Sequence, residues 1–332
     1  VSYNSDSGGV GGHGGKQLIQ VHTGGTLNVD GSLNLNNATA ATRGNRMEVI
    51  GAGALADIGG TFDVGQASMG HSNTLVVSDR GTLVSGSQWN IGEESSYNQA
   101  LVEDNAFVQS ADTAIGLDAA SVSNTLTVTG NGTIWTNTGT ISISPGGGIG
   151  NRLEVNDDAT VYADQMIVGT NGTLSLSGTG FTWVQTDVRI DAGGQLQGVG
   201  LVLGAVTNAG TIAPGASAGK LDIFGDLTLQ NSSVIDMEIA GTAAGEYDEL
   251  IVSGAMTFDG ELKITLLDSF SPEDGDEFTL FGYDSYSGSF DSFDLPALSG
   301  GLDWDTSRVE SEKLVAVVPE PGSLVLLLPA LL

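Results

Sequence analysis

The sequence predicts an all-β fold, a parallel and right-handed β-helix (β-solenoid), and three observations carry this prediction. The first is a repeat, whose copies open with an asparagine at spacings of 28, 25, 26 and 27 residues: Asn45, Asn73, Asn98, Asn124 and Asn151. The second is the alternation of apolar and polar residues within each copy, which is the period of a strand. The third is that no stretch with the 3.6-residue period of a helix interrupts the copies. A fixed period in this range is typical of stacked structural repeats.

Each copy of the repeat holds three short strands, so each is expected to form one coil. In the copy that opens at Asn151, strands are expected at 151–155, 159–162 and 166–168, with apolar residues at alternate positions. One coil cannot bury its inward face alone, whereas a stack of coils covers that face and pairs the backbone groups above and below. The core is therefore expected to consist of Leu, Val and Ile with occasional Trp or Phe.

Four regions follow one another along the 332-residue chain. Residues 1–15 are rich in Gly and predict a flexible lead-in. Residues 16–215 are expected to form the solenoid, with roughly eight coils at about 4.8 Å per coil. Residues 216–317 hold longer alternating strands and the hairpin signal Asp259-Gly260, which predict an all-β cap over the open end. Residues 318–332 form a separate apolar tail.

Composition and charge exclude several classes of protein. Gly contributes 50 residues without the three-residue period of collagen, and hydrophobic residues reach 40%, enough for a packed core. The formal net charge is −30 and the pI about 4.1. Such a surface repels nucleic acid and anionic membranes, so neither is an expected partner. Solubility and self-repulsion explain the charge, with binding of divalent cations as the alternative. Without Cys, the chain has no disulfide framework and no Cys-based metal site.

The last stretch of the sequence resembles a sorting signal. Val318–Ser323 reads Val-Pro-Glu-Pro-Gly-Ser and precedes the apolar run Leu324–Leu332. Together with that run, Pro319, Glu320 and Pro321 resemble the PEP-CTERM signal of Gram-negative bacteria. The run covers about half of the roughly 20 residues that span a bilayer, and no Arg cluster follows it. The resemblance implies export, transient anchoring in a membrane, processing by an exosortase, and a place at the cell surface or in a biofilm matrix.

A second resemblance covers about a third of the chain. Four stretches resemble the end of the solenoid in autotransporter-type passenger repeats: Asn208–Gly215, Gly225–Leu229, Tyr247–Gly254 and Gly288–Phe290. This resemblance implies a secreted β-helical surface protein and no particular chemistry.

Three short motifs resemble parts of polygalacturonase-like β-helical enzymes: Gly12-His13-Gly14, Asp157-Asp158 and Arg189-Ile190-Asp191. Their order is reversed relative to that family, and Asp191 stands where the family has Lys. Glycoside hydrolysis needs two carboxylates at a fixed separation across the sugar, whereas the Asp pair falls in an expected turn, where Asp is common for conformational reasons. The histidines are scattered, without the pattern of a zinc site or a triad: His13, His22 and His71. The protein is therefore expected not to be an enzyme.

An acidic turn is the candidate for a metal site. The stretch 271–277 carries four carboxylates: Glu273, Asp274, Asp276 and Glu277. Oxygen-rich loops bind Ca²⁺, but neither the EF-hand spacing nor a Gly-Gly-x-Gly-x-Asp ladder is present. A solvated turn is the main interpretation and weak Ca²⁺ binding the alternative; no other cofactor is expected.

These observations predict an exported structural or adhesive solenoid at the cell surface or in the extracellular matrix of a Gram-negative bacterium, with self-assembly into filaments as one form of that function. The expected partners are further copies of the chain or extracellular polysaccharide. The alternative is a polysaccharide-binding or polysaccharide-degrading β-helix. That alternative requires aromatic residues such as Tyr97, Trp135 and Tyr162 to lie on one face of the solenoid. The sequence alone leaves the placement of these three residues open.

Overall fold

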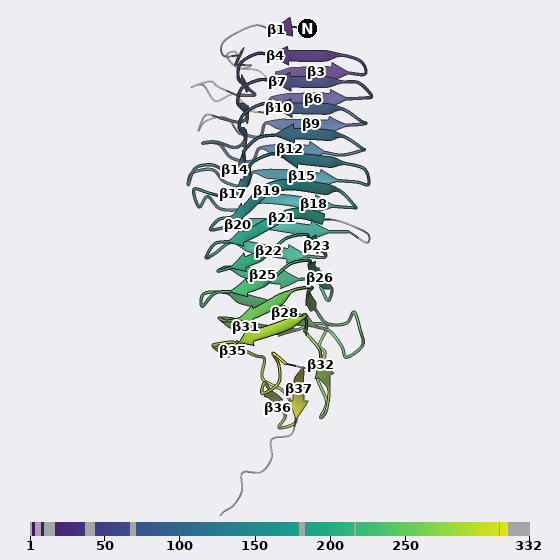
Figure 1. Cartoon of the computed structure of the whole chain (residues 1–332), viewed down its shortest axis with the longest axis vertical. Coiled ribbons are helices and arrows are strands. Elements are labelled where there is room, and N and C mark those ends of the chain that lie inside the picture. Colours follow the sequence, from purple (N-terminus) through teal and green to yellow (C-terminus); the bar gives the residue numbers. More distant parts are fainter. Residues whose placement is uncertain are drawn as a thin grey trace, which may run out of the picture.

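The computed structural model describes residues 2–3, 8–9, 17–36, 44–66, 71–178, 183–215, 217–311 and 313–317. In this part of the chain every regular element is a strand and none is a helix. The strands stack in parallel into a β-solenoid of about ten turns (Figure 1). The all-β parallel solenoid predicted from the repeats is therefore confirmed.

Each coil contributes one strand to a first sheet of twelve strands. These are β3 (Leu18–His22), β6 (Arg46–Ile50), β9 (Thr74–Ser78), β12 (Gln99–Val102), β15 (Thr125–Thr129), β18 (Asn151–Asn156), β20 (Gly172–Ser177), β22 (Gln195–Gly198), β25 (Thr211–Pro214), β28 (Val234–Ile239), β31 (Glu261–Leu266) and β35 (Ser292–Asp294). Successive side chains of a strand point to opposite faces, so Leu126 and Val128 of β15 are buried between outward threonines. The register repeats from coil to coil, and Leu126 lies between Ala100 and Leu153.

The other strands of each coil lie in a second sheet of 22 strands, arranged in two lines. The line that follows the first sheet along the chain holds β1 (Ser2–Tyr3), β4 (Thr26–Val29), β7 (Leu55–Ile58), β10 (Thr82–Ser85), β13 (Phe107–Ser110), β16 (Ile134–Asn137), β23 (Gly200–Val202), β26 (Lys220–Ile223), β29 (Glu249–Val252) and β33 (Phe281–Gly282). The next line holds β2 (Gly8–Gly9), β5 (Leu33–Asn34), β8 (Phe62–Val64), β11 (Trp89–Ile91), β14 (Thr113–Ile115), β17 (Thr140–Ile143), β24 (Val206–Asn208), β27 (Leu227–Leu229), β30 (Ala255–Phe258) and β34 (Ser285–Gly288). Two long strands, β19 (Thr160–Val168) and β21 (Trp183–Ile190), belong to both lines.

Part of the expected flexible lead-in belongs to the fold. Strand β1 pairs with β4, and β2 pairs with β5, so both extend the second sheet at the N-terminal end of the rod. Gly disfavours strands because it loses more conformational freedom on folding than other residues, so the high Gly content of this stretch concealed the pairing.

A continuous hydrophobic core runs along the inside of the solenoid. Its largest side chains include Trp89 and Trp135, which are completely buried and meet edge to face with 5.6 Å between ring centroids. Edge-to-face contacts of this kind add to the stabilisation that burial of the rings provides. The core composition thus matches the expected mixture of aliphatic residues and occasional Trp.

A ladder of five buried asparagines stands at the corner where successive coils return to the first sheet: Asn45, Asn73, Asn98, Asn124 and Asn151. The Nδ2 atoms of Asn73, Asn98 and Asn124 donate to Oδ1 of the ladder residue in the next coil, over 2.9, 2.9 and 3.0 Å. The same acceptor oxygens also receive the backbone N–H of the preceding ladder residue. Buried polar groups are tolerated when they are hydrogen-bonded. The ladder therefore explains why the copies of the repeat open with Asn.

The solenoid continues past residue 215, the boundary expected from the sequence, as far as Asp294. Parallel pairs join β26 to β29 and β28 to β31, as in the earlier coils. The expected hairpin turn Asp259-Gly260 is a corner between β30 and β31, which lie in different sheets. The expectation of a cap over 216–294 was wrong because half-buried parallel and antiparallel strands show the same alternation of apolar and polar residues.

A small antiparallel sheet forms the end of the described chain. It consists of β32 (Glu277–Phe278), β37 (Leu314–Val317) and β36 (Asp303–Asp305), in that order. The sheet lies beyond the last coils at the C-terminal end of the rod (Figure 1). Phe278 is buried there, with ring centroids of Tyr247 and Trp304 at 5.7 and 5.9 Å. We call this three-stranded element the cap sheet.

Candidate functional site

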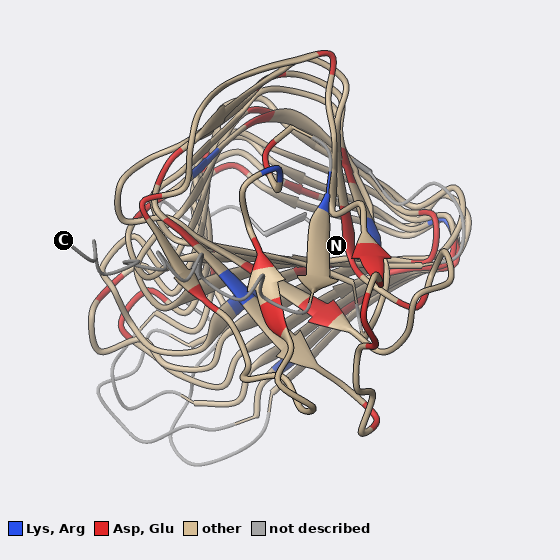
Figure 2. Cartoon of the chain, turned by 90° about the horizontal axis from the view of Figure 1, so that it is seen from below, with Lys and Arg blue, Asp and Glu red and all other residues tan. Residues whose placement is uncertain are grey.

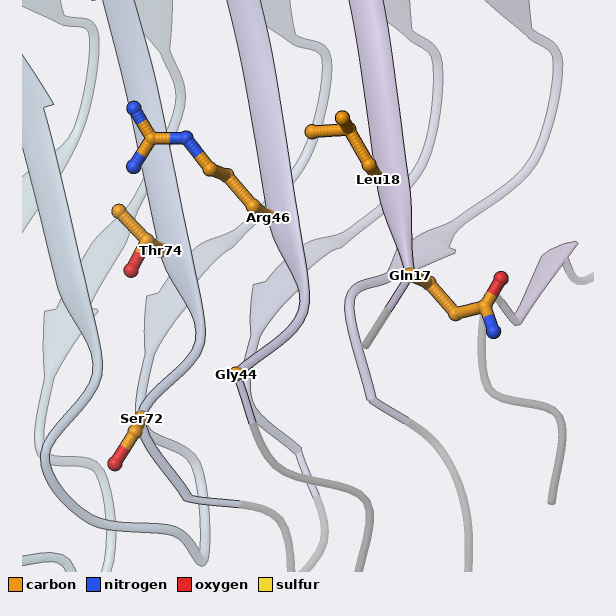
Figure 3. A pocket seen from close by; sticks show the side chains of 6 residues that line it. All are labelled: Gln17, Leu18, Gly44, Arg46, Ser72 and Thr74. Atoms are coloured by element: carbon orange, nitrogen blue, oxygen red, sulfur yellow. The ribbon is translucent and has the colours of Figure 1, made fainter. Parts of the chain in front are cut away.

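A hollow of about 410 Å³ lies on the outer face of the first sheet, towards the N-terminal end of the rod. Its lining residues are Gln17, Leu18, Gly44, Arg46, Ser72 and Thr74 (Figure 3). Three of them, Leu18, Arg46 and Thr74, occupy the same register position on β3, β6 and β9. The others come from the corners just before these strands. Stacking of three coils therefore brings together side chains that lie more than 20 residues apart in the sequence.

The hollow combines a cation, hydroxyl groups and an apolar surface. Figure 3 shows the guanidinium of Arg46 extended towards β9, on the same side as Thr74. Leu18 is 56% exposed at the other edge, so it offers an apolar surface to solvent. The side chain of Gln17 points away from this group in Figure 3. A ligand with both hydroxyl groups and apolar faces matches this chemistry.

Glu48 holds Arg46 in place. The Nε atom of Arg46 lies 2.5 Å from Oε1 of Glu48, and Gln20 donates from Nε2 to the other carboxylate oxygen over 2.7 Å. The hydrogen bond from Gln20, and after it the one from Arg46, lowers the pKa of Glu48. Glu48 is therefore ionised at neutral pH. A guanidinium carries five N–H donors, so this ion pair orients Arg46 without using all of its hydrogen-bonding capacity.

A tyrosine in a strained conformation stands at the next corner. The residue before each ladder asparagine has a positive φ: Gly44 (74°), Ser72 (64°), Tyr97 (59°), Ser123 (54°) and Gly150 (74°). This left-handed conformation suits Gly and costs free energy for a bulky residue. Tyr97 adopts it and is 56% exposed, with its ring edge-on to His71 at 6.4 Å between centroids. A strained side chain that contributes little to the core indicates a role outside folding.

The corners that carry these residues are stacked by backbone hydrogen bonds. The N–H of Gly44 donates to the carbonyl of His71 over 3.1 Å, and the N–H of Ser72 donates to that of Ser96 over 3.2 Å. Tyr97 continues the row by donating to Val122 over 2.9 Å. Tyr97 therefore occupies, one coil further on, the corner position that Gly44 and Ser72 occupy beside the hollow.

Polar side chains extend the outer face of the first sheet beyond the hollow. Two rows of outward side chains continue along the rod, with Gln99, Thr125, Arg152, Thr173 and Gln195 in one and Thr127, Glu154, Ser175 and Gln197 in the other. In the second row the apolar residues Val76 and Leu101 lie between Glu48 and Thr127. Arg152 is paired with Glu154 at 3.3 Å, which repeats the arrangement of Arg46 and Glu48. Figure 2 shows acidic residues around the whole circumference of the rod and few basic ones. The face is thus rich in hydroxyl and amide groups, with its cations already neutralised by neighbouring acids.

The three aromatic residues considered for a polysaccharide-binding face do not converge. Trp135 is completely buried in the core and donates from Nε1 to Ser110 over 2.9 Å. Tyr162 lies in β19 of the second sheet, whereas Tyr97 lies at the corner before the first sheet. Of the three, Tyr97 alone lies in the row of corners that continues from the hollow, one coil beyond its lining residues.

The enzyme-like motifs are placed on different parts of the coil. Asp157 and Asp158 form the corner between β18 and β19, with φ of 50° and 66°. Thr129 donates to Oδ2 of Asp157 over 3.2 Å. Arg189 lies in β21 and pairs with Asp191 at 2.9 Å. His13 lies outside the described residues. The Asp pair therefore has the left-handed conformation that Asp tolerates at tight corners.

Some carboxylate oxygens of the acidic turn already accept hydrogen bonds from groups of the protein. Asp276 accepts the N–H of Glu273 on Oδ2 over 2.7 Å, and Glu277 pairs with Lys313 at 2.5 Å. Asp274 lies between them in the same turn. In the described ranges no three His, Asp or Glu residues are grouped so that they could hold a metal ion. Ca²⁺ binding stays a prediction that only a binding measurement can test.

Two carboxylates are buried in the wall of the solenoid. Asp63 in β8 is 2% exposed and accepts a hydrogen bond from Nδ2 of Asn90 over 2.7 Å, and burial raises its pKa to about 6. Asp248 is 0% exposed, and burial raises its pKa to about 7. Its two oxygens accept the N–H groups of Gly219 and Glu238, both over 2.8 Å. Both residues join neighbouring parts of the wall and neither lines the hollow.

Comparison with known proteins gives no relative from which a function can be transferred. No protein family matches the chain, and no curated protein matches it significantly. Within the described part of the chain no helix is both long and apolar enough to cross a membrane. The sorting motif Pro319, Glu320 and Pro321 lies outside the described residues and stays a prediction. Fold and surface together define a β-solenoid protein with a polar outer face.

Proposed function

We propose that this protein is an exported structural and adhesive β-solenoid of the cell surface or extracellular matrix, and that it binds polysaccharide along the outer face of its first sheet. Two lines of support differ in kind. The resemblance of Pro319, Glu320 and Pro321 to a sorting motif supports export. The hollow and the polar face that extends from it support binding of a hydroxyl-rich polymer.

Tyr97 is the observation that carries the binding proposal. Sugars present hydroxyl groups at their edges and apolar C–H groups on their faces. Arg46, Ser72 and Thr74 offer hydrogen-bonding groups, and the exposed ring of Tyr97 offers a flat surface for a sugar face. The equivalent corners carry Gly44 and Gly150, which adopt a positive φ without strain. A Gly in place of Tyr97 relieves the same strain, but it also removes the aromatic ring.

The rod favours an extended ligand over a compact one. Outward side chains recur along the first sheet at about 4.8 Å per coil, so one polymer chain meets a side chain at the same register position in each successive coil. The asparagine ladder fixes these coils relative to one another, and a rigid surface loses little conformational entropy when it binds. The expected affinity is therefore the sum of many weak contacts.

Charge favours a neutral polysaccharide. The chain carries a net charge of −30, and Arg46 and Arg152 on this face are each paired with a carboxylate. An acidic polysaccharide is repelled by such a surface unless divalent cations intervene. A neutral polymer meets no such barrier.

The alternative function, polysaccharide degradation, has less support. Glycoside hydrolysis needs two carboxylates that face each other across the bound sugar. Glu48, the carboxylate nearest to Arg46, is engaged by Arg46 and Gln20. A cation oriented in this way supports recognition of hydroxyl groups without cleavage of the chain.

Affinity electrophoresis in gels that contain soluble neutral polysaccharides, for example dextran and hydroxyethylcellulose, tests the proposal. Tyr97→Ala and Arg46→Gln are each expected to weaken retardation about fivefold or more, since exposed Tyr and Arg residues dominate many binding surfaces. Phe224→Ala is the matched control, because Phe224 is 64% exposed at the end of β26, away from the first sheet.

Two outcomes contradict the proposal. Retardation that is absent, or unchanged in Tyr97→Ala and Arg46→Gln, removes the hollow as a binding site. Release of reducing ends by the purified protein, lost on Asp157→Asn or Asp158→Asn, shows that the alternative function is correct.

A further inference from the structure

The last coil of the solenoid leaves two aromatic residues of the core exposed. In register, Tyr286 of β34 follows Met256, and Phe293 of β35 follows Leu262. Met256 and Leu262 are completely buried, whereas Tyr286 is 46% exposed and Phe293 38%. Both rings therefore occupy core positions, and within the described chain no further coil covers them.

The two exposed rings are continuous with buried aromatic residues of the core. The ring of Tyr286 lies 6.1 Å from that of Phe258, and the ring of Phe293 lies 6.0 Å from that of Phe290. Phe258 and Phe290 are buried and in contact, with 5.1 Å between their ring centroids. An exposed apolar surface that continues a packed core marks a site of interaction or of aggregation.

Strand β34 also presents a free backbone edge. Within the described chain it pairs with β30 alone, and all four of its residues, Ser285–Gly288, are exposed. Phe281 of β33, in the same coil, is 7% exposed, so the opening lies over β34 and β35. A free strand edge offers unpaired N–H and C=O groups, with which an added extended chain can pair.

Acidic residues stand at both ends of this free edge. Asp284 comes directly before β34, and Asp291 lies at the corner between β34 and β35; both are exposed. The sequence 281–317 holds seven Asp or Glu residues and two Lys or Arg residues. One of these two, Lys313, is already paired with Glu277 at 2.5 Å. The free edge and its exposed rings therefore have an acidic surround.

Charge complementarity favours one kind of occupant. A second copy of the chain carries a net charge of −30 and is repelled by this acidic end. A neutral polysaccharide can stack on the rings, but it leaves the acidic ends without a matching charge. An extended peptide with an apolar centre and Lys or Arg on both sides matches all three features, because its backbone pairs with β34, its apolar side chains cover the ring of Tyr286, and its cations meet Asp284 and Asp291.

We propose that the free edge of β34 binds an extended basic segment of another protein by strand addition. The bound segment becomes the next strand of the second sheet, and the side chains of one of its faces lie against the ring of Tyr286. The site is at the C-terminal end of the rod, whereas the hollow lies towards the N-terminal end (Figure 1). The proposal is therefore independent of polysaccharide binding at the hollow.

A labelled synthetic peptide, Lys-Arg-Val-Ile-Val-Arg-Lys, tests the proposal in a fluorescence anisotropy titration with the 332-residue protein. NaCl at about 150 mM screens long-range attraction to the acidic surface. The same peptide with N-methyl groups on its three central residues keeps the charge but loses the backbone donors, and it is expected to bind about tenfold or more weakly. Bound peptide is expected to slow hydrogen exchange at Ser285–Gly288, with amides of β15 as the internal reference for folding.

Substitution of the exposed ring separates this site from other apolar surface. Tyr286→Ala is expected to weaken binding of the unmodified peptide about fivefold or more, because exposed aromatic residues dominate many binding surfaces. Phe224→Ala is the matched control without effect, since it also removes an exposed ring, 64% exposed at the end of β26.

Substitution of the flanking acids separates this site from the general acidity of the chain. Asp284→Asn/Asp291→Asn is expected to weaken binding about fivefold or more and to reduce its dependence on salt. Asp30→Asn/Asp57→Asn is the matched control without effect, because it removes two exposed acids near the N-terminal end of the rod (Figure 1).

Several results overturn the proposal. Equal affinities of the two peptides show attraction by charge alone, and equal losses in Tyr286→Ala and Phe224→Ala show that the end of the rod is not the site. Slow exchange at Ser285–Gly288 in the unbound protein shows that the edge is already occupied; if the protection grows with protein concentration and light scattering gives a dimer mass, the occupant is a second copy. Displacement of the peptide by dextran overturns the proposal in favour of a carbohydrate ligand.

Discussion

Gly116 leaves the space that the side chain of Asn151 fills: a Cβ atom on Gly116 would lie 2.1 Å from Cγ and from Nδ2 of Asn151. Gly92 stands in the same relation to Asn124, at 2.3 Å. Both glycines also have positive φ, 71° and 78°. The Gly that follows the third strand of a coil is therefore required twice, by its own backbone and by the ladder asparagine that lies four strands later, at the same corner of the next coil.

The first prediction concerns this glycine. Gly116→Ala is expected to lower the free energy of unfolding by about 2 to 4 kcal/mol, because it adds both left-handed strain and a clash with a buried, hydrogen-bonded side chain. Urea unfolding followed by circular dichroism measures the loss. Gly147→Ala is the matched control: Gly147 has φ 79° and no atom within 4 Å of an added Cβ, so it is expected to cost only about 1 kcal/mol. Equal losses in the two variants contradict the ladder argument.

The second prediction concerns the ladder itself. Asn124 donates from Nδ2 to Oδ1 of Asn151 and to the carbonyl of Ser95, and its Oδ1 accepts from Asn98. Asn124→Ala leaves these buried partners unsatisfied, so a loss of about 2 to 4 kcal/mol is expected in the same urea experiment. The exposed Asn131 provides the control, and Asn131→Ala is expected to change stability by less than about 0.5 kcal/mol. A small effect of Asn124→Ala shows that water replaces the ladder.

The strands could be predicted from the sequence because their signal is local. A period of two and a repeat of about 27 residues are visible in the letters alone. The asparagines that open the copies are visible in the sequence as a repeated feature. Only the stacked coils show that Asn124 is hydrogen-bonded to Asn98 and Asn151. The end of the solenoid was misplaced because alternation does not record the direction in which strands pair.

The candidate site was harder to predict from the sequence. The hollow joins Leu18, Arg46 and Thr74, whose proximity depends on register between coils. The sequence identifies Tyr97 as an aromatic residue, but its positive φ becomes predictable only when it is aligned with Gly44 and Gly150 before their ladder asparagines. Ile134 and Trp135 are adjacent apolar residues, so the sequence does not decide which of them faces the core; in the structure Trp135 is completely buried and Ile134 is half-buried.

The third prediction concerns pH. Burial raises the pKa of Asp63 to about 6 and that of Asp248 to about 7, above the ordinary value of 3.8. Between about pH 4 and these raised pKa values, the folded state binds more protons than the unfolded state. The free energy of unfolding is therefore expected to increase as the pH falls from about 7 to about 4. It is expected to decrease again as the pH rises through the folded-state pKa values of about 6 and about 7. Thermal unfolding between pH 4.5 and 8 measures this dependence.

Asp63→Asn separates the buried carboxylate from the general effect of surface charge. An amide oxygen still accepts the hydrogen bond from Asn90, so the variant is expected to fold and to lose part of the pH dependence between about 4 and 6. Asp157→Asn, at an exposed corner, is expected to keep it. Identical pH profiles for the unmodified chain and Asp63→Asn rule out a contribution from Asp63.

The fourth prediction separates folding from binding at Tyr97. Tyr97→Gly relieves a positive φ of 59° and is expected to raise the free energy of unfolding by about 0.5 to 1 kcal/mol. The same variant is expected to weaken retardation by neutral polysaccharide, because it removes the ring. Urea unfolding and affinity electrophoresis on one preparation give both values. A variant that loses stability shows that the ring contributes to folding, and the argument from strain then fails.

The last prediction concerns association. The net charge of −30 makes copies of the chain repel one another. Basic side chains do little to offset this charge, because Arg46, Arg152 and Lys263 are paired with carboxylates of the same chain at 2.5, 3.3 and 2.9 Å. Millimolar Ca²⁺, or a pH near the pI of about 4.1, is therefore expected to promote association that light scattering detects. NaCl at equal ionic strength controls for screening, and chelation of Ca²⁺ is expected to reverse the effect.

The double variant Glu273→Gln/Asp274→Asn tests whether the acidic turn is responsible for the response to Ca²⁺. If the variant abolishes the response, the turn is a specific cation site. If the response persists, Ca²⁺ acts on the whole acidic surface. Scattering that stays flat with Ca²⁺ and down to pH 4 contradicts a cation-assisted role in a matrix.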